Sequence, residues 1–286
     1  MTLKMAQYKL SGHESFHCRQ FWLKKGHDFL EQGNKFTADE AVLLLGVGKN
    51  MVASIRFWLQ AFGVSNQDEP TEFGRKIFSD NGLDPYLEDL ATIWLLHYYL
   101  VKSEYASLYH VMFNQFRKQR TRFEREHVEA FLQANSENAI NENTLKRDLG
   151  VLLKNYLKPA KKTNQIEEDF SVLFHDLNLI SRVDSSKEKN YQIESRERNE
   201  IPTEIILFAI LDNPSYTDTI TFYDLLNGTN SVGNVFALSG DGLFKHIQKI
   251  TDNYDSIVYK DDAGIRTIQF RERLDKWAIL ENYYEG

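Results

Sequence analysis

The chain has 286 residues, of which 42% are hydrophobic and 13% aromatic, so it can bury the core of one large domain or of two to three small ones. Its formal net charge of -7 excludes a surface that is positive throughout, so any binding of nucleic acid depends on local basic patches. The single cysteine, Cys18, excludes an intrachain disulfide, and the opening MTLKMAQYKLSGHESF lacks the apolar core of a signal peptide. We therefore expect a folded cytoplasmic protein. The longest apolar run, 91–101, is shorter than the roughly 20 residues of a membrane-spanning helix.

Two helices are predicted at the start of the chain. Apolar residues recur with helical spacing near residues 19–32, and that helix is expected to end at Gly33. A second helix is expected to begin at Thr37, because Glu40 follows three residues later as in a capping box. The glycine-containing turn at 46–48 is expected to end this helix.

A third helix is predicted from Lys49 to Phe62, before Gly63. Its apolar face is expected to be buried and carries Met51, Val52, Ile55, Trp58, Leu59 and Phe62. The opposite face and its flanks contain no acidic residue and carry Lys49, Asn50, Ala53, Ser54, Arg56, Phe57 and Gln60. A helix with this outer surface can approach phosphates and base edges.

The turn at 46–48 has two interpretations. A phosphate-binding P-loop needs Gly-x-x-x-x-Gly-Lys-Ser/Thr after a strand, whereas here the first glycine is missing, Asn50 replaces the hydroxyl residue and a helix precedes the turn. A short turn with glycine between two helices is instead typical of a helix-turn-helix that binds DNA. We expect Lys49 to contact phosphate, and Asn50, Arg56 and Gln60 to contact bases or phosphate. Ser54 and Phe57 are expected to belong to the same DNA-binding surface. The alternative is a helical hairpin with a polar outer face.

A second basic element is the stretch RKQRTRFER, residues 117–125. Its five basic residues accompany one acidic residue, Glu124, and they are Arg117, Lys118, Arg120, Arg122 and Arg125. Such a run can follow a phosphate backbone, and we expect contacts to DNA from its first four basic side chains. The alternative is a solvated helix face.

The second half of the chain alternates helices with short hairpins. The polar sequence QANSENAINEN predicts a loop and a domain boundary near residues 134–142. Helices follow through Leu145 to Tyr156 and around Phe170, Leu173, Phe174 and Leu177, and strand pairs are predicted at 180–184 with 190–194 and at 256–260 with 265–270. Helices followed by a two-stranded ribbon are the pattern of a winged helix, which we predict twice after residue 140.

The predicted fold is therefore mostly α (α+β), with helix-turn-helix and winged-helix modules and small two-stranded hairpins. We expect an N-terminal helical domain at 1–135 and a winged-helix-like region at 140–286, either whole or as two modules, 140–196 and 200–286. In the last module, the helix at 239–251 exposes Lys245, Gln248 and Lys249, and its hairpin carries Lys260 and Arg266. These residues form a second predicted DNA interface, and protein binding is the alternative.

The string His13-Glu14-Ser15-Phe16-His17 matches the His-Glu-x-x-His pattern of zinc proteases, in which both imidazoles bind the metal and the Glu activates water. Here no long buried helix surrounds the string and no third ligand is obvious. We expect a structured turn in which His13 and Glu14 bond to packed neighbours, with no metal, cofactor or catalytic residue. A zinc-dependent hydrolase through His13, Glu14 and His17 ranks third among the interpretations.

Four strings carry a resemblance to a known family: GHESFHCRQFWLKKG (12–26), LGVGKNMVASIRFWLQAFG (45–63), TEFGRKIF (71–78) and DNGLDPYLEDLATIWLLHYYL (80–100). They closely resemble a bacterial domain-of-unknown-function family. Its members are often encoded beside sulfurtransferases similar to phosphoadenosine phosphosulfate reductases, in DNA phosphorothioation and phage-defence clusters. The resemblance implies a setting in DNA modification, and it transfers no catalytic residue.

Together these observations predict a non-enzymatic subunit of a DNA-modification or phage-defence system. Its expected partners are double-stranded DNA and a modification or restriction enzyme such as a sulfurtransferase. The alternative is a protein-binding scaffold of the same fold that does not touch DNA.

Overall fold

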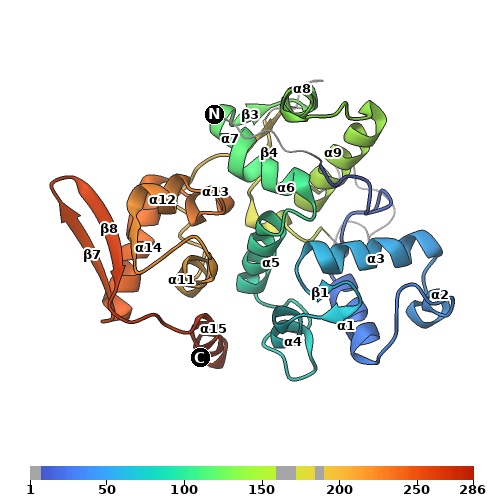
Figure 1. Ribbon diagram of the computed structural model, residues 1–286, viewed down its shortest axis with the longest axis horizontal. Coiled ribbons are helices and arrows are strands. Elements are labelled where there is room, and N and C mark those ends of the chain that lie inside the picture. Colours follow the sequence, from blue (N-terminus) through green and yellow to red (C-terminus); the bar gives the residue numbers. More distant parts are fainter. Residues whose placement is uncertain (1–7, 159–171, 184–189) are drawn as a thin grey trace. The chain divides into compact units, whose positions relative to one another are not determined.

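The computed structural model describes residues 8–158, 172–183 and 190–286, and it is about 52% helical with 11% strand. The expected α+β class with small antiparallel sheets is therefore confirmed. The chain forms two compact units, Met1–Ile193 and Glu194–Gly286 (Figure 1). The boundary expected at 134–142 lies instead inside the first unit, between two helices that pack against each other.

Unit 1 begins with a group of helices around one buried helix. Its elements are α1 (Trp22–Glu31), α2 (Ala41–Leu45), α3 (Lys49–Ala61), β1 (Ser65–Asn66), β2 (Glu69–Pro70), α4 (Glu72–Phe78) and α5 (Leu90–Lys102). α1 packs against α3 and α4. The predicted first and third helices are confirmed, but the second begins at Ala41 rather than Thr37, because residues 37–40 form turns and Glu40 makes no side-chain cap. The β1–β2 hairpin was not predicted.

The rest of unit 1 contains a helical segment with a π-helical turn, a small sheet and two longer helices. Its elements are α6 (Ser107–Val111), η1 (Met112–Phe116), α7 (Arg117–Gln119), β3 (Arg122–Phe123), α8 (Arg125–Asn135), α9 (Glu142–Tyr156), η2 (His175–Leu177), β4 (Ser181–Arg182) and β5 (Tyr191–Gln192). η1 is a π-helical turn between α6 and α7. The sheet order is β3-β5-β4, with both pairs antiparallel. Of the helix expected around residues 170–177, residues 170 and 171 lie outside the described residues, and only the short η2 follows.

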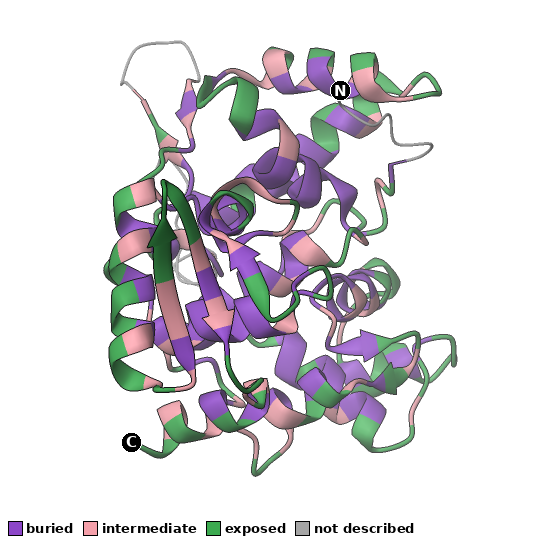
Figure 2. Ribbon diagram, turned by 60° about the vertical axis from the view of Figure 1, so that its left-hand side comes forward, coloured by how far each residue is buried: buried purple, intermediate pink, exposed green. Residues whose placement is uncertain are grey.

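Unit 2 has one sheet and five helices in the described chain. Its elements are α11 (Thr203–Asp212), β6 (Thr219–Thr221), α12 (Phe222–Asn227), α13 (Val232–Val235), α14 (Gly240–Asn253), β7 (Ile257–Asp262), β8 (Ile265–Phe270) and α15 (Lys276–Glu285). The predicted hairpin is confirmed as β7–β8, and the sheet order is β6-β8-β7. Residues 260–266, at the hairpin tip, are exposed (Figure 2).

The two three-stranded sheets have the same order: first strand, last strand, middle strand. Among the described residues, helices separate the first strand of each sheet from a closing hairpin. The order is β3–α8–α9–η2–β4–β5 in unit 1 and β6–α12–α13–α14–β7–β8 in unit 2. The predicted pattern of helices and then a hairpin thus occurs twice, but the first instance starts at β3, before residue 140.

The core of unit 1 is rich in aromatic side chains. α5 is buried on almost every side, and its His97 ring meets Phe113 edge-on at 4.7 Å and Tyr156 at 5.8 Å between centroids. The Tyr156 hydroxyl lies 3.0 Å from His97 Nδ1. In unit 2 the apolar α11 packs against α15, where Phe208 and Trp277 meet at 5.3 Å. Among the described helices, none combines the length and apolarity that a bilayer crossing requires.

Candidate functional site

Glycines set the geometry between α2 and α3. Gly46 has φ 60° and ψ 34°, a left-handed conformation that glycine adopts without the strain a side chain introduces. Gly48 is extended, with φ -66° and ψ 158°, and α3 begins directly after it. The turn therefore redirects the chain from one helix into the next, as the sequence predicted.

The exposed surface of α3 is confined to its first two turns. Lys49, Asn50 and Ala53 are exposed, while Arg56 and Gln60 are half-buried. Ser54 is 0% exposed and Phe57 is 7% exposed, so the expectation that these two side chains face DNA is wrong.

Neighbours that no helical pattern reveals explain the burial of Phe57. Its ring meets the His13 ring edge-on at 5.6 Å and the Tyr105 ring at 5.4 Å. A Cβ on Gly12 would lie 2.4 Å from Phe57 Cδ2, so glycine allows the N-terminal segment to cross this close to α3. The outer side of α3 is thus covered at its C-terminal half by residues from two distant parts of the sequence.

Arg56 is held by the unpredicted hairpin. Its Nε lies 3.0 Å from Oδ1 of Asp68, which is part of the turn between β1 and β2. Gln60 Nε2 donates to the Arg56 carbonyl oxygen at 3.5 Å. The Arg56 charge is therefore partly neutralised within unit 1.

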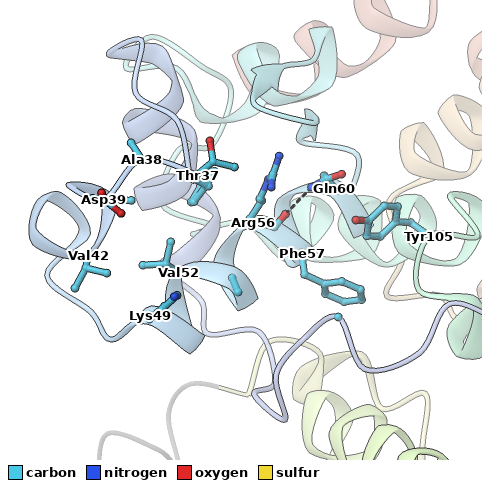
Figure 3. Close-up of a pocket in the computed structure, with 14 residues that line it drawn as sticks. Thr37, Ala38, Asp39, Val42, Lys49, Val52, Arg56, Phe57, Gln60 and Tyr105 are labelled. Atoms are coloured by element: carbon cyan, nitrogen blue, oxygen red, sulfur yellow. Dashed lines mark hydrogen bonds between the residues drawn. The ribbon is translucent and has the colours of Figure 1, made fainter.

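A cleft of about 550 Å³ follows the outer side of α3 (Figure 3). Its walls are the segment 36–42, the α3 side chains and Tyr105, whose ring points toward Gln60 and Phe57 (Figure 3). Lys49 and Arg56 are its cations and Asp39 its acid. Burial raises the pKa of Tyr105, and the nearby Arg56 opposes this shift, so its hydroxyl stays a hydrogen-bond donor at neutral pH. The cleft joins apolar and polar groups on the surface predicted to meet DNA.

The short helix α2 presents apolar side chains to solvent beside this cleft. Val42 is 40% exposed, Leu43 82% and Leu44 58%, and only Ala41 and Leu45 are buried. Isolated apolar side chains are ordinary on protein surfaces, but three in succession form a patch that suits contact with another molecule.

The His-Glu-x-x-His string is a turn and not a helix. Ser11, Glu14 and Ser15 have positive φ values of 71°, 49° and 70°. His13 is buried, with Nε2 3.4 Å from Oδ1 of Asp148, and its ring stacks on Trp58 at 6.0 Å.

His17 has different surroundings. It lines a cavity of about 260 Å³ together with Arg19 and Lys154, cations that disfavour a metal ion. Glu14 is exposed, so of the two side chains expected to bond to packed neighbours only His13 lies beside one, Asp148. In the described chain, no three His, Cys, Asp or Glu side chains gather as metal ligands. The His-Glu-x-x-His geometry of a zinc hydrolase is therefore not present.

The basic run at 117–125 is only partly on the surface. Arg117 begins α7 directly after the π-helical turn and is 8% exposed, so the expectation that it contacts DNA is wrong. Lys118, Arg120 and Arg122 are exposed, and Arg122 Nε donates to Gln192 Oε1 of β5 at 3.2 Å.

The predicted surface of unit 2 is exposed as expected. Lys245, Gln248 and Lys249 lie on the outer side of α14, and Lys260 and Arg266 on the β7–β8 hairpin. Lys245 Nζ lies 2.6 Å from Oε2 of Glu197, and this contact holds the pKa of Glu197 below its usual value. The Arg266 guanidinium lies 4.1 Å from the centre of the Phe222 ring. An open groove of about 710 Å³ runs between α14 and β7.

The chain belongs to the family described as "Protein of unknown function (DUF4007)", whose model matches residues 10–284. It is also similar to the solved "Magnesium ion-bound SspB crystal structure", with a TM-score of 0.84 and 25% identity over 98% of this chain and 88% of that one. The "SspB crystal structure" aligns with a TM-score of 0.84 and 26% identity over 99% and 90% of the two chains. No curated protein matches. The resemblance to a family of unknown function is thus confirmed, and the sulfurtransferase neighbourhood stays a prediction.

Proposed function

We propose that this DUF4007 protein is a DNA-binding or adaptor subunit, with no catalytic role of its own, of a bacterial DNA phosphorothioation or phage-defence system. The observation that carries the proposal is the first half of α3, where Lys49, Asn50 and Ala53 are exposed directly after a left-handed glycine turn. No acidic residue interrupts α3. The proposed role in DNA modification or phage defence rests on the resemblance of the four N-terminal strings to a protein family that is often encoded in such gene clusters.

The contacts to DNA fall on the exposed turns of α3. Lys49 supplies a charge for a backbone phosphate, and Asn50 supplies an amide that can pair with an adenine edge. Small Ala53, about one turn further along α3, lets a groove wall approach the helix. Arg56 contributes less, because Asp68 already pairs with it.

The element order of unit 2 supports a winged-helix role for its outer surface. α11, β6, α12 with α13, α14 and the β7–β8 hairpin follow one another as helices and strands do in that fold, and β6 joins the hairpin in one sheet. Lys245, Gln248 and Lys249 then lie where such a domain contacts its ligand, either DNA or a partner protein.

A salt titration of binding to duplex DNA from the host tests the proposal. Lys49→Ala is expected to weaken binding to all sequences and to lower the slope of log affinity against log salt by about one. Asn50→Ala is expected to cost roughly 1 to 3 kcal/mol on a preferred site and to relax sequence preference. Lys154→Ala removes an exposed lysine of α9, beside His17 and outside the predicted DNA surface, and serves as the charge control.

A protein-binding scaffold is the second candidate, and the exposed apolar side chains of α2 favour it. Val42, Leu43 and Leu44 form an exposed apolar patch, and burying such a patch against another protein is favourable. If the wild type binds no duplex DNA, alone or with its partner enzyme, and Leu43→Ser abolishes binding of that enzyme, the scaffold interpretation replaces the DNA-binding one.

A further inference from the structure

The strand β7 has an open edge. In the sheet order β6-β8-β7 it is the outer strand, and in the described chain only β8 pairs with it (Figure 1). An edge of this kind presents unpaired backbone N–H and C=O groups that can bind another strand.

The register identifies which backbone groups face outward. Arg271 N donates to the Ser256 carbonyl oxygen at 2.8 Å, and antiparallel partners alternate between bonded and non-bonded pairs. Val258 and Lys260 therefore bond to β8, while the backbone groups of Ile257, Tyr259 and Asp261 point away from it. Ile257 N already donates to the Tyr254 carbonyl oxygen at 2.9 Å. Its carbonyl and both groups of Tyr259 remain directed toward the open edge.

The groove of about 710 Å³ lies along this edge. The consecutive residues Ile257, Val258 and Tyr259 line one wall, and α14 supplies the other. The rings of Phe244 and Tyr259 meet at 5.5 Å, which gives the groove an apolar wall. The polar liners on α14 and beside it are Asn199, Lys245, Gln248, Lys249, Thr251 and Asp252.

We infer that this groove binds an extended, acidic peptide segment of a partner protein, which adds to β7 as a further strand. The peptide backbone would pair with the outward groups of Ile257 and Tyr259. Its alternate side chains would point to α14, where acidic ones meet Lys249 and an apolar one meets Phe244. Lys245 contributes less charge, because Glu197 lies 2.6 Å from it.

The charges of the groove favour a peptide over duplex DNA. Asp252 lines the groove, and Asp261 and Asp262 are exposed at the hairpin tip. These carboxylates repel a continuous polyanion, whereas separate acidic side chains can be spaced to avoid them. A phosphate of DNA could accept from the Tyr259 N–H, but a duplex has no extended peptide backbone that pairs with both the N–H and the C=O of Tyr259. The inference concerns the partner-binding half of the proposed function and is independent of DNA contact through α3.

A selection from displayed random ten-residue peptides, with the full chain as bait, tests this inference. Tyr259→Pro removes the outward N–H without removing a bond to β8, so it is the negative bait, and Tyr259→Ala keeps the N–H and loses only the ring. Circular dichroism confirms the fold of each variant. The expected binders have an acidic residue at alternate positions and bind wild type and Tyr259→Ala, but not Tyr259→Pro.

Synthetic copies of the selected peptides then separate backbone from charge. Methylation of alternate peptide nitrogens on one edge and Lys249→Glu are each expected to weaken binding by about ten-fold or more. Lys49→Glu is expected to leave peptide binding unchanged and to abolish DNA binding, so failure of the two proposals is distinguishable. If no peptide is enriched over the Tyr259→Pro bait, or if methylation has no effect, strand addition is wrong. Loss of duplex DNA binding in Lys249→Glu, with no peptide selected, assigns the groove to nucleic acid.

Discussion

α3 of unit 1 and α14 of unit 2 are comparable helices with different surroundings. Each is an amphipathic helix of 13 or 14 residues that precedes a hairpin and buries one apolar face. On α3, the N-terminal turn and Tyr105 cover the second half of the outer side, and Asp68 pairs with Arg56. On α14, the outer side stays exposed next to an unpaired strand edge.

The difference shows that a helix is not a binding surface merely because it stands in the order of helices and strands that DNA-binding folds have. What its outer face can do is decided by segments that lie far away in the sequence. For α3 these segments leave the first two turns for contact with a ligand, and for α14 they leave a groove that also offers backbone groups. The two helices therefore suit different kinds of partner.

The largest expected effect is a loss of folding stability when a buried side chain on the inner face of either helix is truncated. Trp58 and Ile247 are each 0% exposed. Trp58→Ala is expected to cost about 3 to 5 kcal/mol and Ile247→Ala about 2 to 5 kcal/mol in the free energy of unfolding. Trp58 is the costlier, because its Nε1 also donates to the Phe16 carbonyl oxygen at 3.1 Å and its ring stacks on His13.

Urea unfolding followed by fluorescence measures both changes. Trp277 is the tryptophan of unit 2, so comparison with Trp277→Phe, which leaves the tryptophans of unit 1 in place, identifies the transition of unit 2. Two separate transitions are expected, with Ile247→Ala shifting only the Trp277 transition. A single shared transition in every variant would show that the two helices belong to one cooperative unit.

A smaller effect is expected from the turn that begins α3. Gly46 has positive φ, and Gly46→Ala is expected to cost about 1 kcal/mol for that conformation. Gly48 is the matched control, because its φ of -66° suits any residue and a Cβ there would meet nothing within 4 Å. Gly48 is also the N-cap of α3, where Ala is a poorer cap than Gly, but Ala restricts the unfolded chain more, so Gly48→Ala is expected to leave the urea midpoint nearly unchanged. Equal losses in the two variants would contradict the role of the left-handed turn.

The fold was predictable where local pattern decides it. The stripe through Ile55 and Trp58 predicted α3, and alternating residues between turn signals predicted β7–β8. The strands β1, β2 and β3 are two residues long, too short to carry a period of their own. The predicted domain boundary at 134–142 followed from polar composition, but α8 and α9 on its two sides pack together, and no sequence pattern records that contact.

The candidate site was predictable in position and only partly in detail. Lys49 and Asn50 are exposed as the helical period implied. Phe57 lies on the same side of the helix as Lys49 and Asn50 but is buried under His13 and Tyr105. Its aromatic character was a signal, since a large apolar side chain on an outer face often marks a second contact. The free edge of β7 follows only from the sheet order.

A weaker effect is expected when a carboxylate beside α3 or beside α14 is neutralised and DNA binding is measured. Asp68→Asn removes the carboxylate that pairs with Arg56, and duplex DNA binding is expected to strengthen roughly five-fold because the α3 surface becomes more positive. Asp252→Asn makes the same change beside α14 and is expected to leave DNA binding through α3 unaffected. Fluorescence anisotropy at one fixed salt concentration measures both variants. Equal gains would show that DNA contacts both helices.

The smallest expected effect is a dependence of unit 2 on pH through the inner side of α14. His246 is 2% exposed, with Nε2 3.2 Å from the Arg198 carbonyl oxygen, and burial lowers its pKa from the ordinary value of 6.5. Because the folded pKa is the lower one, the unfolded chain takes up the proton first as pH falls. The contribution of His246 to the stability of unit 2 is therefore complete above pH 6.5 and declines as pH falls below 6.5 toward the folded pKa.

His246→Gln keeps a donor for the Arg198 carbonyl oxygen but does not titrate. Its Trp277 transition is therefore expected to lose less stability between pH 7 and pH 5 than that of the wild type. His27 in unit 1 has a pKa lowered by burial and partly restored by Glu31 and Asp28, so His27→Gln is expected to change the unit 1 transition and not that of Trp277. Identical pH profiles for the wild type and His246→Gln would show that the buried imidazole is not the source of the decline.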